Sequence, residues 1–189
     1  TWTKVLYLGT GVGIGDMVIN TNNTSIIYAT GRHRFRSNNA SIITGQRTKI
    51  YRSSNGGSSW DTLSSGLPIG VQCRIGLCIS SSNPDILYAN YVNDQLECGG
   101  IYKTTNGGNS WTMTNDGSSI NMGGFGWYFG PIRLDPNDNN KVYVLAISMY
   151  KSTNGGSSFT DIGGFTHADK HDLKFKNSVK SFIKNMVCA

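Results

Sequence analysis

The fold is decided by a ten-residue motif that the chain contains three times, as YRSSNGGSSW at 51–60, YKTTNGGNSW at 102–111 and YKSTNGGSSF at 150–159. We call each copy a box. The boxes recur at intervals of 51 and 48 residues, counted between their asparagines, and this period is typical of β-propeller blades. Asn-Gly between β-forming residues is a strong signal for a tight hairpin, because both residues tolerate positive φ. Each box is therefore predicted to be a strand, a turn and a strand.

Two more strands are predicted upstream of each box, where short apolar runs flank turns rich in Asn, Asp and Pro. The runs cover residues 17–19 and 26–29, 75–79 and 86–89, and 131–134 and 141–144. Each unit then has four antiparallel strands, which we label A to D in chain order. The fold class is predicted to be all-β, with three full blades at about 14–68, 72–116 and 127–163.

The two ends of the chain resemble parts of further blades. Trp2 aligns with the last aromatic of a box, so Thr1–Leu8 is predicted to be a leftover strand D. His167–Phe175 is predicted to be strand A of another blade, with 164–189 forming the start of that blade and a Lys-rich tail that we leave unassigned. Residues 1–189 would be a single partial propeller domain of about three and a half blades. Since rings use about four to eight blades, another copy or the rest of a longer chain would complete the ring.

Composition narrows the function classes. Charged residues make up 15% of the 189 residues, and no apolar stretch is long enough to span a membrane. The net charge is +6, but no nucleic-acid-binding motif accompanies it, so no nucleic-acid partner is predicted.

A long insertion between strands B and C of the first blade, Gly31–Thr48, carries four arginines. It could cap a face of the blades or bind an anion, but a disordered surface loop is expected.

The boxes resemble the Asp-box (BNR) repeat of sialidases, sortilin-type receptors and xyloglucan-cleaving endoglucanases, with asparagine in place of the usual aspartate. The wider run, from about 14 to 175, is similar to secreted bacterial sortilin-like or glycosyl-hydrolase-like propeller proteins. This resemblance implies a β-propeller that acts outside the cell or on its surface. It also implies a structural role for the box residues Ser53, Asn55, Gly57, Trp60, Thr104, Asn106, Gly108, Trp111, Ser152, Asn154, Gly156 and Phe159.

In propellers of this kind the D–A and B–C loops lie together at one end of the blades, which we call the top face, and ligand sites usually lie there. The D–A loop at 123–128 ends in Trp127 and Tyr128, whose flat apolar faces suit sugar rings. These two residues are predicted to bind a ligand, and the alternative is that both pack between blades.

His167, Asp169 and His171 are a second candidate. Alternate residues of a strand share a face, so the three side chains would point the same way. His167 and His171 are predicted to contribute to ligand binding, and such a pair could also hold a metal or move a proton. The alternative is an exposed polar strand end. No resident metal or cofactor is predicted.

A glycoside hydrolase needs two suitably spaced carboxylates. Asp16 and Asp169 both begin predicted A strands, so they are the candidate catalytic pair. The sialidase arginine signature is missing, which argues against a sialidase. Among the cysteines, Cys73 and Cys98 are placed where they could form a disulfide, and Cys78 is expected to be a buried free thiol.

The sequence therefore favours a secreted or cell-surface propeller that binds a polysaccharide or a protein, or assembles with other copies, through its top-face loops. The alternative is a glycoside hydrolase of the Asp-box propeller type. A mutation of Asp16 or Asp169 would separate these two functions.

Overall fold

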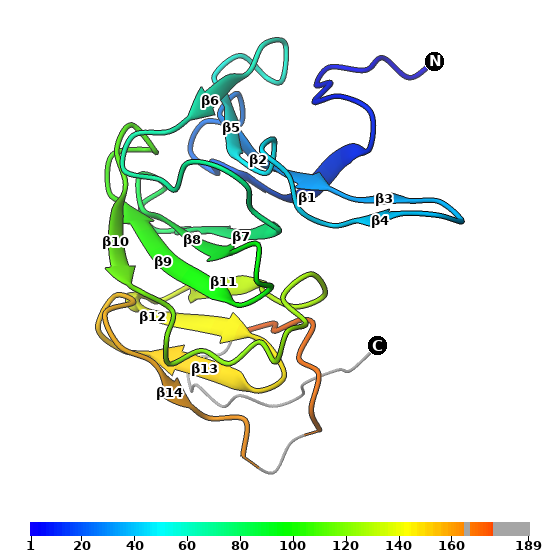
Figure 1. Cartoon of the computed structure of the whole chain (residues 1–189). Coiled ribbons are helices and arrows are strands. Elements are labelled where there is room, and N and C mark those ends of the chain that lie inside the picture. The colour runs from blue at the N-terminus through cyan, green and yellow to red at the C-terminus, as the bar shows by residue number, and fades with distance from the viewer. Residues whose placement is uncertain (165–166, 176–189) are drawn as a thin grey trace.

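The computed structural model describes residues 1–164 and 167–175, and it contains three four-stranded antiparallel sheets packed side by side (Figure 1). We call them blades 1, 2 and 3. Blade 1 contains β1 (Val12–Ile19), β2 (Ile27–His33), β5 (Ile50–Ser53) and β6 (Asp61–Leu63). Blade 2 contains β7 (Arg74–Ile79), β8 (Leu87–Val92), β9 (Cys98–Thr104) and β10 (Thr112–Asn115). Blade 3 contains β11 (Ile132–Asp135), β12 (Asp138–Leu145), β13 (Met149–Ser152) and β14 (Thr160–Asp161). The all-β, blade-type fold expected from the sequence is confirmed.

Each box closes its turn with the same hydrogen bonds. In blade 1, the Ser53 hydroxyl accepts from the amides of Asn55 (3.3 Å) and Gly57 (2.8 Å) and donates to Asn55 Oδ1 (2.9 Å). The Asn55 side chain in turn accepts from the Ser59 amide and donates to the Ser59 hydroxyl. The boxes of blades 2 and 3 repeat these contacts through Thr104 and Asn106, and through Ser152 and Asn154. Local polar side chains thus satisfy much of the turn backbone, and a bond from the first glycine amide of each turn to a carbonyl earlier in the chain adds to them, as from Gly56 to Ser25.

The blades are joined by apolar cores and by a few polar side chains that cross between them. Tyr28, Leu77 and Trp111 belong to the core between blades 1 and 2, whereas Phe129 and Val144 belong to the core between blades 2 and 3. The Tyr28 hydroxyl donates to the Gly107 carbonyl of the next blade, and the Tyr88 hydroxyl repeats this bond to the Asn139 carbonyl, each at 2.9 Å. A buried tyrosine in strand B therefore ties each of the first two blades to the next, through the box turn in blade 2 and through β12 in blade 3.

Two expectations for the chain ends are wrong. Thr1–Leu8 forms no strand, and Trp2 is fully exposed. His167–Phe175 also forms no strand but runs along blade 3, where the amide of Lys170 donates to the Ala146 carbonyl at 2.9 Å. Leu173 is buried against Tyr143, Leu145 and Met149. This segment is held by apolar burial and isolated hydrogen bonds in place of a strand ladder. The rest of the expected further blade, and the Lys-rich tail, lie outside the described residues.

The insertion of blade 1 is ordered, contrary to the disordered loop that we expected. It forms a two-stranded hairpin of β3 (Phe35–Arg36) and β4 (Ser41–Ile42), which projects from the blade in Figure 1. The pairing of Phe35 with Ile42 across the hairpin supports this arrangement, because two apolar side chains meet on one face.

Within residues 1–164 and 167–175, no helix is long and apolar enough to cross a membrane.

Candidate functional site

The loop between β10 and β11 is held from one side by Glu97, in the connection between β8 and β9. Its carboxylate accepts hydrogen bonds from the backbone amides of Met122 (3.0 Å) and Gly124 (2.6 Å). The amide of Gly126 donates to the Leu96 carbonyl at 2.9 Å. Hydrogen bonds to an ionised carboxylate are stronger than those between neutral groups, so Glu97 holds two amides of this loop firmly, and the Leu96 carbonyl holds a third.

Two arginines hold the same loop from the other side. Arg32, in β2, donates from Nη2 to the Trp127 carbonyl, and Arg74, at the start of β7, donates from Nη1 to the Tyr128 carbonyl at 2.6 Å. The base of the loop is tied by Asn90, whose side-chain amide donates to the Gly130 carbonyl at 3.0 Å. Side chains of blades 1 and 2 thus fix a loop that leads into blade 3.

The fixed loop presents an aromatic surface. The rings of Trp127 and Tyr128 lie 5.3 Å apart, and His171 packs edge-on against Tyr128 with 4.4 Å between ring centroids. Phe129 lies beneath and stacks on His171 at 5.3 Å. We call Trp127, Tyr128 and His171 the aromatic platform. About half of the Tyr128 surface and half of the neighbouring Phe125 surface are exposed, whereas Trp127 is partly buried against the core between blades 2 and 3, so the platform is open to a ligand at Tyr128.

The structure therefore brings together three of the four residues expected to bind a ligand. His167 is separate: it is exposed, and its Nδ1 lies 2.5 Å from the Ala168 carbonyl. The expected alternation of His167, Asp169 and His171 is wrong, because the segment forms no strand and Asp169 has a left-handed φ of 72°. No group of three or more His, Cys, Asp or Glu side chains able to hold a metal is present in the described part of the chain.

The candidate catalytic carboxylates occupy different places. Asp16 lies in β1 of blade 1, where Oδ1 accepts from the Met17 amide at 3.0 Å and Oδ2 from the Leu77 amide of blade 2 at 3.1 Å. Asp169 is exposed, and its amide donates to the Ile147 carbonyl of blade 3. Asp16 thus uses both carboxylate oxygens to link two blades, and no contact in the described structure joins it to Asp169.

The three cysteines among the described residues, Cys73, Cys78 and Cys98, are free thiols, so the expected bridge between Cys73 and Cys98 is not formed. Cys98 instead donates from Sγ to Asn90 Oδ1 at 3.2 Å. Burial raises the pKa of the Cys73 and Cys98 thiols to about 11 each, and that of Cys78 to about 12. These groups are neutral at physiological pH. The buried free thiol expected at Cys78 is confirmed, and Cys188 lies outside the described residues.

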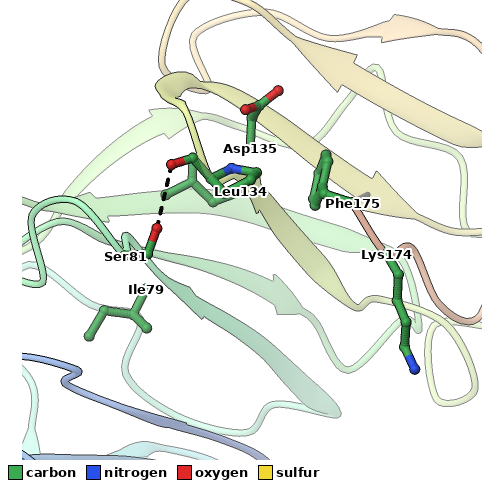
Figure 2. A pocket seen from close by; sticks show the side chains of 7 residues that line it. Ile79, Ser81, Leu134, Asp135, Lys174 and Phe175 are labelled. Carbon is green, nitrogen blue, oxygen red and sulfur yellow. Dashed lines mark hydrogen bonds between the residues drawn. The ribbon is translucent and has the colours of Figure 1, made fainter. Parts of the chain in front are cut away.

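A cavity of about 380 Å³ lies at the ends of β7 and β11 remote from the aromatic platform (Figure 2). Its wall is mainly apolar, and Ser81 Oγ donates to the Pro136 carbonyl at 3.4 Å across one side. The residues that line it are Ile79, Ser81, Leu134, Asp135, Pro136, Lys174 and Phe175. Sequence reasoning did not identify this cavity, because it depends on how the 167–175 segment lies against blade 3.

Comparison with known proteins supports the fold. No protein-family model matches the chain. A xyloglucanase of Hypocrea jecorina (strain QM6a) is 39% identical over 59 residues, which are 31% of this chain and 7% of that protein. The GH74 enzyme of Niastella koreensis matches 80% of this chain at 25% identity with a TM-score of 0.55. The GH74 xyloglucanase of Xanthomonas campestris matches 83% at 16% identity with a TM-score of 0.58.

A structure of YCF48 bound to D1 peptide matches 82% of the chain at 14% identity with a TM-score of 0.52. At such identities the likeness to this structure and to the Xanthomonas enzyme is one of fold alone. The chain spans 23% of the length of each of the two GH74 structures.

Proposed function

We propose that the chain is part of a β-propeller that binds polysaccharide on its top face, through the aromatic platform. The observation that carries this proposal is the pair of Tyr128, which is half-exposed, and Trp127, which is partly buried, on a loop that Glu97 and two arginines hold in place. A sugar ring stacks on an aromatic face through its apolar C–H surface, and a surface that is ordered before binding loses little entropy on binding. The local similarity to a xyloglucanase supports a glycan as the ligand.

The alternative is glycoside hydrolysis by the same face. Retaining and inverting hydrolases both need a pair of carboxyl groups that flank the scissile bond, at about 5 Å or about 6.5–9.5 Å. Of the candidate pair, Asp16 already accepts two backbone amides, and no contact in the described structure joins it to the exposed Asp169. The described geometry therefore favours binding over cleavage. We further propose that the protein acts at the cell surface or outside the cell, and that another copy or the remainder of a longer chain completes the ring.

The test is calorimetric titration of the chain with xyloglucan oligosaccharides, before and after Trp127→Ala. Loss of the stacking face is expected to weaken binding about tenfold, which corresponds to ~1.4 kcal/mol. Arg32 donates to the backbone carbonyl of Trp127, so this substitution leaves the acceptor of that hydrogen bond in place.

Trp2→Ala is the matched control, since Trp2 is an exposed tryptophan outside the platform. Equal affinity of the Trp127 variant and the unaltered chain would overturn the platform as the binding site. Cleavage of the oligosaccharides that is lost in Asp16→Asn would instead favour the hydrolase.

A further inference from the structure

Three arginines surround the aromatic platform without a carboxylate partner. Arg32 lies in β2, Arg34 follows directly in the connection to β3, and Arg74 begins β7 of the neighbouring blade. None of them takes part in an ion pair with any described residue, although Arg133, further along the same face, pairs with Asp172 at 3.0 Å. Three unneutralised guanidinium groups therefore lie at one end of the blades.

The most exposed of them, Arg34, lies directly against the platform. Its guanidinium carbon is 5.2 Å from the centroid of the Trp127 ring, so cation and ring are in contact. Arg32 donates to the carbonyl of the same Trp127. The guanidinium lies over the face of the ring, so a ligand that approaches the platform on this side of Trp127 would meet the N–H groups of Arg34.

The third arginine has unused hydrogen-bonding capacity. Arg74 donates from Nη1 to the Tyr128 carbonyl, but its Nε is buried and has no hydrogen-bond partner. A buried donor without a partner is unfavourable, because it has lost its hydrogen bonds to water and has gained none in the protein. Burial, followed by repulsion from Arg32, lowers the pKa of Arg74 to about 10. Burial, followed by repulsion from Arg34, also lowers the pKa of Arg32.

The groups that face this cluster do not neutralise it. Asp16 is the carboxylate that acts on Arg74, and its oxygens accept the amides of Met17 and Leu77. The Cys73 thiol lies among the three arginines and is neutral at physiological pH, since burial raises its pKa to about 11. The site therefore has a surplus of positive charge that an anionic ligand would relieve.

We propose that this cluster recognises a carboxylate on the glycan, so that the ligand of the platform is an acidic polysaccharide that contains uronic acid residues. This proposal rests on the glycan-binding function proposed above. A uronic acid combines the two features that the site presents: a sugar ring for the platform, where Tyr128 is exposed, and a planar carboxylate for Arg34. The guanidinium fork pairs with a carboxylate through two parallel, charge-assisted hydrogen bonds, which are stronger than those that the neutral hydroxyl groups of a sugar can accept.

The experiment is calorimetric titration with galacturonate and glucuronate oligosaccharides, each beside the same oligosaccharide with its carboxyl groups reduced to alcohols. The unaltered chain is expected to bind the acidic form at least tenfold more tightly than the reduced form, and the difference is expected to shrink in 0.5 M salt. Arg34→Gln is expected to abolish the difference. Arg36→Gln removes the same charge from an exposed position in β3, and it is expected to change affinity less than twofold.

The outcomes separate the two proposals. If the reduced oligosaccharides bind as tightly as the acidic ones and Trp127→Ala weakens both, the platform binds glycan but the acidic specificity is wrong. If Arg34→Gln and Arg36→Gln weaken binding equally, long-range attraction explains the preference and the Arg34 contact is overturned. If neither form binds, the glycan-binding function fails and this inference fails with it.

Discussion

Glu97 accepts a hydrogen bond of 2.6 Å from the backbone amide of Gly124, and its second carboxylate oxygen accepts the amide of Met122. Glu97 is the only glutamate of the chain. It belongs to blade 2, whereas the loop that it holds leads into blade 3. One carboxylate therefore sets the conformation of the loop that carries Trp127 and Tyr128.

Glu97→Gln is expected to loosen this loop. A glutamine presents one acceptor and one donor, so one of the two backbone amides loses its partner, at a cost of about 1–3 kcal/mol in the free energy of unfolding. Hydrogen exchange of the amides of Met122 and Gly124 should become faster, and this is the measurement. Asp94→Asn in the same connection is the control, because Asp94 is exposed and its side chain makes no hydrogen bond in the described structure. Equal effects of the two substitutions would contradict the anchoring role.

The box turn is expected to accept aspartate but not alanine. In Asn106→Asp the carboxylate still accepts from Thr104 and from the Ser110 amide, and the Ser110 hydroxyl can reverse to become the donor. Asn106→Ala removes all of these bonds and is expected to destabilise the chain by about 1–3 kcal/mol, against less than about 0.5 kcal/mol for Asn106→Asp. Thermal unfolding at pH 7 checks this difference. Asn137→Ala, in an exposed turn outside the boxes, is the control. A loss of stability as large as that of Asn106→Ala would contradict a particular role for the box asparagine.

Gly76 lies where β7 of blade 2 packs closely against the chain that enters blade 3. A Cβ atom at this position in β7 would lie 2.2 Å from the Gly130 carbonyl oxygen. Gly76→Ala is therefore expected to force the blades apart and to lower stability by about 1–3 kcal/mol in denaturant unfolding. Gly13 in β1 is the matched control, since a Cβ there meets no atom within 4 Å. Gly13→Ala is expected to be neutral or stabilising, and a loss as large as that of Gly76→Ala would count against the packing explanation.

The burial of the three thiols has consequences for their reactivity and for the pH dependence of the free energy of unfolding. In a Cys188→Ser background, a thiol reagent at pH 8 is expected to label Cys73, Cys78 and Cys98 only after unfolding. The reason is that burial raises their pKa values to about 11, 12 and 11.

In the unfolded chain these thiols ionise near their ordinary pKa of 9.0. The stability that neutral burial provides is therefore present below pH 9 and is lost as pH rises toward 11 to 12. Fast labelling of the folded chain, or stability that increases above pH 9, would contradict this.

Sequence reasoning was accurate where structure is local. The strands and turns of the three blades lie close to the predicted runs, because each turn is closed by side chains within four residues of one another, as Ser53, Asn55 and Ser59 show. The predictions were wrong at the two chain ends, where the four-strand pattern was extended beyond the three complete blades. Thr1–Leu8 and His167–Phe175 resemble strands D and A, but each lacks a described partner strand with which to form a ladder.

The sequence by itself determined the blade: the spacing of the boxes, the turn chemistry and the alternation of apolar residues are properties of neighbouring positions. Only the tertiary structure decided the site. Glu97, Trp127 and His171 are far apart in the chain, and packing between blades 2 and 3 and the following segment brings them to one end of the molecule. Arg32 and Arg74 reach that loop from two other strands. The burial of these two arginines and their lack of carboxylate partners depend on contacts between blades. A local sequence pattern does not specify such contacts.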